Sequence, residues 1–554
     1  MSKIAPFNSS KFLNNDFFGK KITSPLTIPS GIVTTATSII QHIFDTMPEV
    51  GVLTTKSVGL EPRPGYREPV ISQYAPGCFV NAVGLTNPGA RQLAESLATL
   101  KVPEDRFLLT SIFGGSVEEF VEVAKIVAPF SDGLELNLSC PHAKGYGMAM
   151  GQDPKLVKEI TAAVKAVVDI PVIPKLTPNT DNIAEIARAA VEGGADGLCA
   201  INTVGPGYTS AYGHPVLSNG AGGMSGKGVL PIGLKCVREI AEAVDCPIIG
   251  CGGVSSADDV RAFVNAGADI VGVGSALIGL TTDEMRDYFQ TLHRDLEYGK
   301  KQAESMIRYD VDMQFRPVTL VSNKRVTDDI CIVTFDRKVN VQAGEFIFLW
   351  IPGLGEKPFS ALTDDPFSLV VIDVGIFTHE LMALEPGIEV YVRGPYGIPV
   401  NPGDGAKIMA VSGGTGLAAV YQIARDFENA EIFTGARSGE RLYFLDECKK
   451  IANVHVATDD GSEGYQGFVT ELLRDRLQEM PREELDNLVF YNCGPAPMVH
   501  AAIAVQREFC RDDQIFSAID YLTKCGIGLC GACAAPDGRR LCVDGPFLEA
   551  SCSL

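Results

Sequence analysis

The sequence predicts a multidomain α/β protein that begins with a (β/α)8 TIM barrel and continues through an antiparallel β-barrel and a second α/β domain to a short cysteine-rich segment. Three observations support this fold class. Strand-like and helix-like stretches alternate over the first ~300 residues, short β-like runs follow, and four cysteines gather near the C-terminus. The chain has 554 residues, and a prior of ~150 residues per domain gives roughly four domains.

Residues 1–305 carry the barrel pattern. Apolar runs such as GVLTTKSV, RFLLTSIFGG and GLELNLSC alternate with amphipathic stretches such as DPKLVKEITAAVKAVV, in which apolar residues recur at helical spacing. Repeated alternation predicts parallel βα units that close into a barrel, whose site lies where the strands end. The chemically distinctive residues are expected just after these strands: Lys56, Asn81, Cys140, Lys175, Asn202, Gly252 and Gly274.

A polar segment near residues 297–312 marks the predicted end of the barrel. The runs KRVTDDICIVTFD, GEFIFLWIP and IEVYVRGPYG then predict an antiparallel β-barrel over 315–405. A strand–turn–helix pattern returns at KIMAVSGGTGLAAVYQIARDF and predicts an α/β domain over 406–515. Residues 516–554 form the cysteine-rich segment.

The cysteine spacing in CGIGLCGACAAPDGRRLC predicts a metal cluster. Cys525, Cys530 and Cys533 follow the C-x4-C-x2-C spacing of plant-type iron–sulfur proteins, and Cys542 supplies a fourth thiolate. Such a [2Fe–2S] cluster carries one electron at a time and has no substrate of its own. The rest of the chain is therefore expected to contain an electron source and an electron sink.

Composition limits the partners and the compartment. The net charge of −21 argues against nucleic acid or an anionic membrane as a partner. The sequence shows no secretory leader pattern and no ~20-residue apolar run. Fifteen cysteines in such a chain indicate reduced thiols and a metal site rather than a disulfide framework. We expect a cytoplasmic protein.

Two glycine-rich turns predict nucleotide binding in the second α/β domain. AVSGGTGLAAVYQIA places three glycines between a strand and a helix, where backbone N–H groups can approach a pyrophosphate. NCGPAPMVHA, at residues 492–501, repeats the arrangement. Upstream, EKPFSALTDD puts a lysine and a serine at a strand end. These two residues could bind a diphosphate. The alternative is that the lysine is simply exposed and the serine caps a helix.

Residues 315–554 resemble the electron-transfer subunit of NAD-linked dihydroorotate dehydrogenases, a ferredoxin-reductase-like protein. The resemblance rests on KPFS, GGTGLAA, TDDGSEGYQGFVTELL, CGPAPM and the cysteine loop, and it implies FAD, NAD and a [2Fe–2S] cluster. Lys357 stands where the family motif has Arg, whose bidentate fork a lysine lacks. The implied FAD- and NAD-binding residues are Lys357, Pro358, Phe359, Ser360, Thr378, Gly413, Gly414, Gly416, Cys493 and Gly494. The implied cluster ligands are Cys525, Cys530, Cys533 and Cys542.

The residues alone do not decide between NAD and NADP. GARSGERL contains Arg437, Ser438 and Arg441, which could hold a 2′-phosphate or form a solvated turn. The family resemblance favours NAD.

The predicted barrel mouth carries side chains that both donate and accept hydrogen bonds. Asn81, Asn137, Asn202 and Thr203 are of this kind. Several amide readers in one mouth suggest a flat ligand with alternating N–H and C=O groups, such as a pyrimidine. Cys140 precedes a glycine-rich stretch and is a candidate base, although a buried structural cysteine is the commoner case.

Two further turns, GCGGVSSADD and GVGSAL, precede helices and predict phosphate binding late in the barrel. With Lys56 and Lys175 at other strand ends, the expected occupant is FMN, and Lys175 suits the negative charge of its reduced ring. Either lysine alone would more often be a surface residue.

Residues 1–305 resemble class 1 dihydroorotate dehydrogenases through PSG, TTKSV, NAVGLTNPG, NLSCP, KLTPN, INT, GGMSG, GCGG and VGSA, in family order. The resemblance implies that Cys140 is the catalytic base. The implied substrate-binding positions are Lys56, Asn81, Ala82, Val83, Gly84, Leu85, Asn137, His142, Asn202 and Thr203. The implied FMN-binding positions are Ser30, Lys56, Ser57, Asn137, Lys175, Ile201, Gly226, Gly252, Gly253, Gly274 and Ser275.

Together the two resemblances imply oxidation of (S)-dihydroorotate to orotate in pyrimidine biosynthesis, with electrons passing from FMN through the cluster and FAD to NAD+. His142 departs from the usual SCPN and matches the SCPH of dihydropyrimidine dehydrogenases. An NAD(P)H-dependent uracil or thymine dehydrogenase is therefore one alternative, and a non-catalytic electron carrier or scaffold is another. Two-subunit relatives form dimers of barrels, so we expect a homodimer.

Overall fold

The computed structural model describes the chain apart from residues 1–6, 14–15, 139–147, 520–521 and 554. The backbone divides into two units. The first unit comprises Met1–Val311 together with Ile527–Ala532, and the second comprises Asp312–Gly526 together with Cys533–Leu554.

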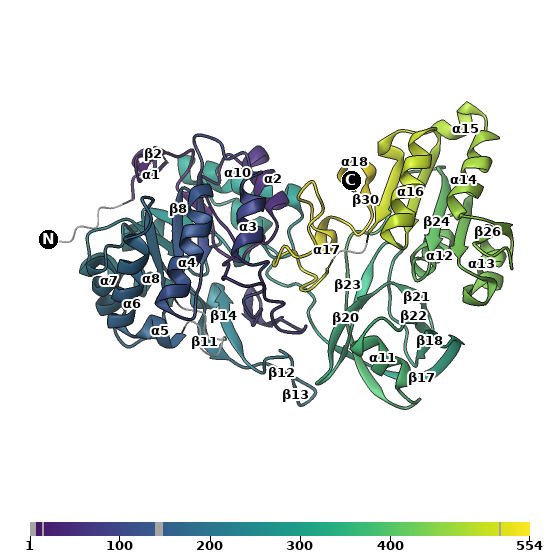
Figure 1. Cartoon of the computed structure of the whole chain (residues 1–554), viewed down its shortest axis with the longest axis horizontal. Helices are drawn as coiled ribbons and strands as arrows, with labels where there is room; N and C mark the ends of the chain where they lie inside the picture. Colours follow the sequence, from purple (N-terminus) through teal and green to yellow (C-terminus); the bar gives the residue numbers. More distant parts are fainter. Residues whose placement is uncertain (1–6, 14–15, 139–147, 520–521, 554) are drawn as a thin grey trace. The chain divides into compact units, whose positions relative to one another are not determined.

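Eight parallel strands close into a barrel in the first unit, whose residues 1–311 run from purple to teal in Figure 1. The last barrel strand, β16, pairs back onto the first, β3. The predicted TIM barrel is therefore confirmed. Strands such as β8 are buried along their whole length, because helices cover the outer face and side chains fill the interior. The barrel strands are β3 (Leu26–Ile28), β4 (Val52–Thr54), β7 (Phe107–Ile112), β8 (Gly133–Asn137), β9 (Val172–Leu176), β10 (Leu198–Ala200), β15 (Ile248–Cys251) and β16 (Ile270–Gly272).

A helix follows each barrel strand in the chain. The apolar faces of these helices are buried, as the helical spacing in the sequence predicts. Capping side chains fix several starts; Ser116, for example, accepts a hydrogen bond from the backbone of Glu119. The helices are α2 (Thr37–Thr46), α3 (Ala90–Leu97), α4 (Val117–Val127), α6 (Pro154–Lys165), α7 (Ile183–Glu192), α8 (Leu230–Ala243), α9 (Ala257–Ala266) and α10 (Thr282–Tyr298).

A separate antiparallel sheet corrects one sequence expectation. Asn81 does not follow a barrel strand, because it ends β6 (Cys78–Asn81), which pairs antiparallel with β5 (Ile71–Ala75) and β14 (Gly222–Gly226). The fourth strand of this sheet is β11 (Val204–Gly207). β5 and β6 form a hairpin inserted between β4 and β7. Short elements complete the unit: α1 (Ser9–Leu13), β1 (Asp16–Phe17), β2 (Lys20–Lys21), α5 (Met148–Gln152), β12 (Ser210–Ala211) and β13 (His214–Pro215).

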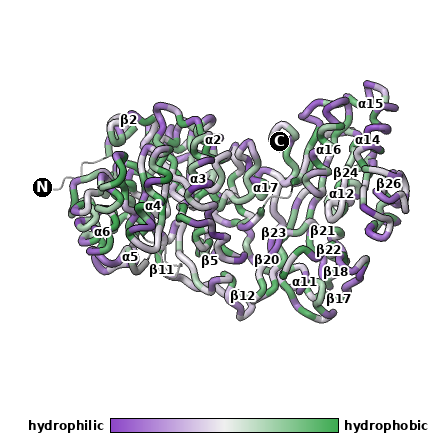
Figure 2. Tube along the Cα trace, viewed as in Figure 1, coloured by the Kyte–Doolittle hydropathy of each residue, from purple (hydrophilic) through white to green (hydrophobic). Residues whose placement is uncertain are grey.

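The second unit opens with the predicted antiparallel strands, which form a seven-stranded sheet in the order β20-β19-β23-β17-β18-β22-β21. Its core is apolar, and Figure 2 shows hydrophobic residues over β21 and β22. The strands are β17 (Arg316–Thr327), β18 (Ile330–Phe335), β19 (Phe346–Ile351), β20 (Gly355–Phe359), β21 (Ala361–Asp364), β22 (Phe367–Ile372) and β23 (Glu389–Tyr396), and α11 (Ile376–Ala383) lies between the last two.

A seven-stranded sheet follows, parallel except for its last strand, in the order β27-β26-β25-β24-β28-β29-β30. Its strands are β24 (Lys407–Gly413), β25 (Ala430–Ala436), β26 (Asn453–Thr458), β27 (Tyr465–Gln466), β28 (Leu488–Cys493), β29 (Ile515–Ala518) and β30 (Leu548–Glu549). Its helices are α12 (Gly416–Asp426), α13 (Leu445–Ile451), α14 (Val469–Gln478), α15 (Arg482–Asp486) and α16 (Ala496–Arg507), with α17 (Leu541–Asp544) and α18 (Ala550–Ser553) near the C-terminus. Within the described ranges, no helix is long and apolar enough to span a membrane.

An ion cluster ties together the starts of three strands of the parallel sheet. Glu431 Oε2 lies 2.9 Å from His455 Nε2, and Glu431 Oε1 lies 3.1 Å from Arg476 Nη2 and 3.3 Å from Lys407 Nζ. The hydrogen bond with His455, helped by the two cations and opposed by partial burial, lowers the pKa of Glu431 to about 2. The charged carboxylate therefore stabilises the folded state.

We predict that Glu431→Gln lowers the stability of this unit by about 1–3 kcal/mol at pH 7. A carboxylate whose folded-state pKa is depressed contributes its full stability above the unfolded pKa and loses it as the pH falls towards the folded pKa. The difference in the free energy of unfolding between wild type and variant should stay constant down to about pH 5 and become smaller below it. Calorimetry between pH 7 and 3 measures this difference. Glu484→Gln is the control, because half-exposed Glu484 contacts only Lys407 in this cluster. A difference in unfolding free energy that does not change with pH would contradict the lowered pKa of Glu431.

Candidate functional site

A chain of buried and half-buried polar side chains runs across the carboxyl ends of the barrel strands. The hydroxyl oxygens of Ser30 and Ser57 lie 3.1 Å apart, and those of Ser57 and Ser111 lie 2.9 Å apart. Ser111 donates to Glu135 Oε1 at 2.9 Å, and Asn137 Nδ2 donates to Ser57 Oγ at 2.9 Å. The structure thus brings the predicted residues Ser30, Ser57 and Asn137 into one network. Ser111 and Glu135 belong to the same network, but the sequence analysis did not single them out.

Lys175 and Glu135 form a buried ion pair at this network. Lys175 Nζ lies 3.6 Å from Glu135 Oε2, and the two side chains are 7% and 1% exposed. Burial by itself would lower the pKa of Lys175, but the attraction and hydrogen bond of Glu135, together with the nearby Cys199 and Cys251 thiols, raise it above its usual range. Lys175 therefore carries a fixed positive charge. Glu135 could have been noticed as a carboxylate inside the apolar strand GLELN, since such a group requires a partner.

Amide side chains extend the network towards the loops after β9 and β10. Asn202 Nδ2 donates to Asn137 Oδ1 at 3.4 Å, and Asn202 Oδ1 accepts from the backbone N–H of Thr203 at 2.8 Å. Asn179 donates to the carbonyl of Thr203 at 3.1 Å and accepts from the N–H of Gly205 at 2.9 Å. Asn179, which the sequence did not single out, therefore fixes the loop that presents Asn202 and Thr203. Ile201 precedes this loop and is buried.

The loop NAVGLTN is held by its own amides. Asn81 Nδ2 donates to the carbonyl of Gly223 at 3.3 Å. Asn87 accepts from the backbone N–H groups of Gly59 and Gly89 and donates to the carbonyl of Leu85. The Asn87 side chain is thus occupied in shaping the loop rather than in reading a ligand. Its predicted neighbours Ala82 and Leu85 are buried, whereas Val83 and Gly84 are partly exposed.

Predicted phosphate-binding glycines come together from two sheets. A Cβ on Gly253, whose φ is +77°, would lie 2.6 Å from the carbonyl oxygen of Gly226 and 3.0 Å from the N–H nitrogen of Leu230. The turn at Gly252 and Gly253 therefore packs directly on the end of β14. Gly274 and Ser275 follow β16 in the next turn of the barrel. Lys56, after β4, packs over Gly31, where a Cβ would lie 3.2 Å from its Nζ.

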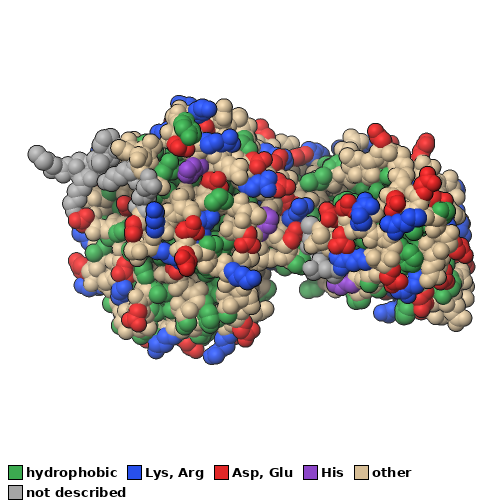
Figure 3. Space-filling view, turned by 90° about the horizontal axis from the view of Figure 1, so that it is seen from above, with side chains coloured by type: hydrophobic (Ala, Val, Ile, Leu, Met, Phe, Trp, Pro, Cys, Tyr) green, Lys and Arg blue, Asp and Glu red, His purple; other side chains and the backbone are tan. Residues whose placement is uncertain are grey.

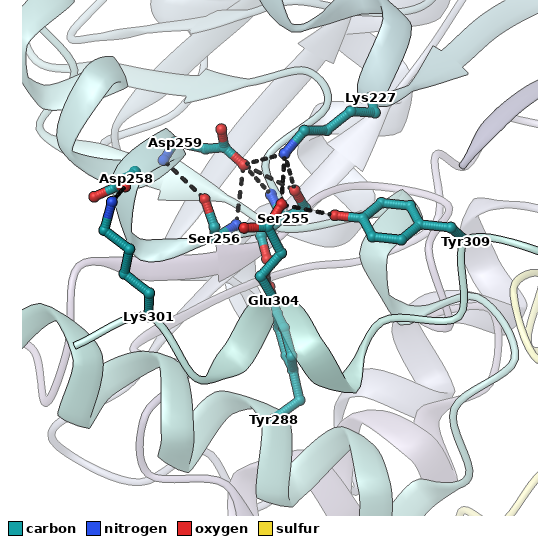
Figure 4. Close-up of polar contacts among 9 residues, drawn as sticks. All are labelled: Lys227, Ser255, Ser256, Asp258, Asp259, Tyr288, Lys301, Glu304 and Tyr309. Carbon is teal, nitrogen blue, oxygen red and sulfur yellow. Dashed lines mark hydrogen bonds and ion pairs between the residues drawn. The ribbon is translucent and has the colours of Figure 1, made fainter. Parts of the chain in front are cut away.

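Lys227 connects the segment after α10 to the turn between β15 and α9. Its Nζ lies 2.8 Å from Ser255 Oγ and 3.3 Å from both Asp259 Oδ2 and Glu304 Oε1. Tyr309 Oη donates to the same oxygen of Glu304 at 3.1 Å, so carboxylates and hydroxyls converge on one ammonium group (Figure 4). Residues 299–311, which lead out of the barrel unit, are anchored here.

The second unit contains a pocket at the predicted flavin motif. Pro358, Phe359 and Ser360 line it, together with Cys493 and Phe547. β20 ends at Phe359, so KPFS lies at a strand end as predicted. Lys357 is partly exposed on the same strand. Thr378 lies on α11, where its hydroxyl accepts from the backbone N–H groups of Val374 and Gly375 and so caps the helix.

The two glycine-rich turns of the parallel sheet lie side by side. β24 and β28 are neighbours, with Ser412 opposite Cys493. A Cβ on Gly494 would lie 2.9 Å from the Gly413 carbonyl oxygen, and one on Gly416 would lie 1.9 Å from the Cys493 carbonyl oxygen. Gly414 faces more open space, with only one neighbouring atom at 3.9 Å. This crevice at the carboxyl ends of parallel strands is where such sheets bind nucleotides.

Three predicted cluster ligands converge in the second unit. Cys525, Cys533 and Cys542 are at most 2% exposed, and the Sγ atoms of Cys533 and Cys542 lie 3.4 Å apart. Cys530 belongs to Ile527–Ala532, which is part of the barrel unit; there Thr35 donates to the Cys530 carbonyl at 2.5 Å. Over the described ranges, no three His, Cys, Asp or Glu side chains are arranged for a single metal ion. A two-iron cluster, which distributes its thiolates over two irons, suits this set.

The donor sets fit the expected cofactors. A fixed cation beside buried hydroxyl and amide groups suits a flavin ring in the barrel, and crowded glycine turns suit its phosphate. An aromatic and hydroxyl-lined pocket beside a glycine crevice suits a second flavin and a nicotinamide nucleotide. Cys140 and His142 lie outside the described residues, so their predicted roles rest on the sequence.

Comparisons with known proteins agree with this geometry. Residues 12–296 match the family model for dihydroorotate dehydrogenase. The chain belongs to the dihydroorotate dehydrogenase family. Residues 522–551 match the iron–sulfur cluster binding domain of dihydroorotate dehydrogenase B, and residues 410–503 match an oxidoreductase NAD-binding domain.

Three relatives match about half of this dihydroorotate dehydrogenase family member. Each is a dihydroorotate dehydrogenase B (NAD+) catalytic subunit. The Pyrococcus horikoshii protein is 41% identical over 302 residues, covering 54% of this chain and 96% of the relative. The Pyrococcus abyssi protein is 44% identical over 266 residues, and the Methanocaldococcus jannaschii protein is 42% identical over 269; each match covers 48% of this chain and 87% of the relative.

We predict that Gly253→Ala weakens FMN binding by at least about tenfold, because the added Cβ would push the turn away from Gly226. Gly213→Ala is the matched control: its φ is +82°, so the left-handed strain is similar, but no atom lies within 4 Å of the added Cβ. FMN per chain after gel filtration measures the effect. Equal FMN retention in both variants would contradict the assignment of this turn.

Proposed function

We propose that this chain oxidises (S)-dihydroorotate to orotate and delivers the electrons to NAD+, as a class 1B enzyme with its catalytic and electron-transfer parts in one polypeptide. The observation that carries the proposal is the buried Lys175–Glu135 pair and its amide network in a barrel whose own chain also contains cluster-binding and NAD-binding domains. The relatives' names all give dihydroorotate dehydrogenase B, which favours dihydroorotate over the alternative substrates.

The substrate side of the proposal uses the amide network. Asn137, Asn202 and Thr203 offer the alternating donors and acceptors that a dihydropyrimidine ring requires. Lys56 and the backbone of Asn81–Leu85 suit the substrate carboxylate, and His142 takes the place of the family's usual Asn. Cys140 is the proposed base, which removes the C5 proton. A thiol has a pKa of ~8.5, so a nearby cation is needed to favour the thiolate.

The proposal assigns a set of residues to each cofactor. The barrel residues hold FMN, with Lys175 at the flavin ring and the glycine turns at the phosphate. KPFS and its pocket hold FAD, the crevice at Gly413, Gly414, Gly416 and Gly494 holds NAD, and the four cysteines hold the cluster. Bound at these residues, FMN would supply hydride acceptance from C6, the cluster would supply single-electron transfer, and FAD would supply hydride transfer to NAD+.

NAD rather than NADP is supported by one contact. Arg441 Nη1 and Nη2 donate to the two carboxylate oxygens of Asp329 at 3.0 and 2.8 Å. A carboxylate already neutralises this arginine, which therefore does not favour a 2′-phosphate.

Homodimerisation through the barrel and a cytoplasmic location also belong to the proposal, on the strength of the family resemblance. A reducing compartment preserves cluster thiolates. The net charge of −21 supports small-molecule partners over nucleic acid, and acidic and basic side chains mingle on the face drawn in Figure 3.

We predict that Cys140→Ala lowers dihydroorotate oxidation by about 10²–10⁴-fold, because the C5 proton loses its acceptor. NADH oxidation by an artificial acceptor such as ferricyanide should be unchanged, since it needs only the second unit. Cys246→Ala, which removes another thiol of the barrel unit, should leave both rates at the wild-type level. Parallel loss of both activities in Cys140→Ala would contradict this division of roles.

We predict that orotate accepts electrons from NADH with a kcat/KM at least about 100-fold higher than uracil, because uracil lacks the carboxylate that the site binds. The assay is steady-state NADH oxidation with the two acceptors in parallel, with flavin and iron measured on the same sample. Preference for uracil would favour a dihydropyrimidine dehydrogenase. Purified protein without FMN and without either activity would favour an electron carrier or scaffold.

A further inference from the structure

A fully buried arginine connects three elements of the second unit. Arg393 lies on β23 and Glu356 on β20, and their side chains are 1% and 0% exposed. β19 runs between these two strands, and its residue Phe348 pairs with Arg393 in register. The Arg393 Cζ lies 4.1 Å from the centre of the Phe348 ring. The guanidinium therefore crosses β19 over an aromatic face to reach the carboxylate.

The nitrogen atoms of this guanidinium bond partners on two different sides. Nε donates to Glu356 Oε2 at 2.8 Å and Nη2 to Glu356 Oε1 at 2.6 Å, which is the bidentate fork that only arginine forms. Nη1 points the other way and donates to Tyr396 Oη at 2.8 Å and to the carbonyl oxygen of Cys525 at 3.2 Å. Tyr396 donates in turn to the carbonyl of Asp312 at 2.5 Å.

The chain at Cys525 is confined on two sides by this arrangement. Its carbonyl accepts the bond from Arg393, and the following residue, Gly526, has a φ of +79°. A Cβ on Gly526 would lie 2.7 Å from Phe348 Cε2, so the backbone passes directly over the same ring that supports the guanidinium. The path of the backbone at Cys525 and Gly526 is thus set by Arg393 and Phe348.

The other end of the ion pair reaches the flavin motif. Glu356 immediately precedes Lys357, and Pro358, Phe359 and Ser360 line the pocket. One guanidinium therefore joins the strand that carries KPFS to the first cysteine of the cluster loop, 132 residues away from Arg393 in sequence.

On the basis of the function proposed above, we infer that Arg393 is a positioning residue: it holds Cys525 against the strand of the flavin motif and makes the cluster easier to reduce. Its carboxylate partner lies at Nε and Nη2, so the positive end of the pair faces Cys525. Reduction adds one negative charge to the cluster without forming a bond, and an oriented positive charge nearby stabilises that state. Net charge and hydrogen bonding around the ligands are among the protein's means of setting such potentials.

The test is an EPR-monitored redox titration of the full-length holoprotein with dithionite. Arg393→Met/Glu356→Met removes both charges together, because removing one alone would leave the other buried without its partner. We expect this variant to retain iron, to show an altered EPR spectrum, and to lower the equilibrium constant for cluster reduction at least tenfold, which is about 59 mV for one electron. Arg393→Lys, which keeps the charge but loses the fork, should fall between this variant and wild type.

Arg425→Met is the matched control. Arg425 also pairs with carboxylates in this unit, at 2.9 Å from Asp364 and 2.6 Å from Asp426, and its loss should leave the potential and the spectrum unchanged. A wild-type potential and spectrum in the double variant would overturn the inference. If the double variant does not retain its cluster, Arg393→Lys decides: a shifted potential supports the inference, and a wild-type potential and spectrum overturn it.

The titration uses dithionite, so its outcome does not depend on the pyrimidine substrate. Failure of dihydroorotate to reduce the protein would refute the proposed function and leave a shifted potential standing as support for Arg393.

Discussion

The barrel site depends on one buried ion pair. Lys175 and Glu135 are both excluded from water, and removing two charges from water costs more than their mutual attraction returns unless hydrogen bonds satisfy the remaining atoms. Ser111 satisfies Glu135 and leads through Ser57 to Asn137 and then to Asn202. The requirement to satisfy one buried carboxylate thus orders the side chains that face the proposed ligand.

The second unit applies the same arrangement. Arg393 and Glu356 are likewise buried, and Nη1 of Arg393, which does not contact Glu356, donates to the Tyr396 hydroxyl and to the Cys525 carbonyl. In each unit a fixed cation stands next to residues expected to hold a redox group. Such a cation stabilises the negative charge that arrives on reduction, so both pairs favour electron acceptance. Pairing with a carboxylate offsets part of the free-energy cost of burying each cation.

Periodicity in the sequence was sufficient to predict the TIM barrel, the antiparallel strands that follow it and the second α/β domain, because each of these burial patterns repeats along the chain. The antiparallel strands, expected to form a barrel, form a seven-stranded sheet. Periodicity misplaced Asn81, since a hairpin strand and a barrel strand have the same local pattern and differ only in their partners. Motifs located the glycine turns and the cysteines, since these depend on short spacings. Arg393 and Asn179 were missed because their partners are brought to them by strand order. Glu135 did leave a signal, a carboxylate inside an apolar strand.

We propose that one chain carries electrons from a dihydropyrimidine to NAD+. The most direct measurement is an anaerobic titration of the full chain with dihydroorotate, following flavin absorbance and the cluster EPR signal, in the absence of NAD+. Two flavins accept two electrons each and the cluster one, so complete reduction should consume about 2.5 dihydroorotate per chain and produce the same amount of orotate. Reduction of the flavins and the cluster by NADH but not by dihydroorotate would contradict the account.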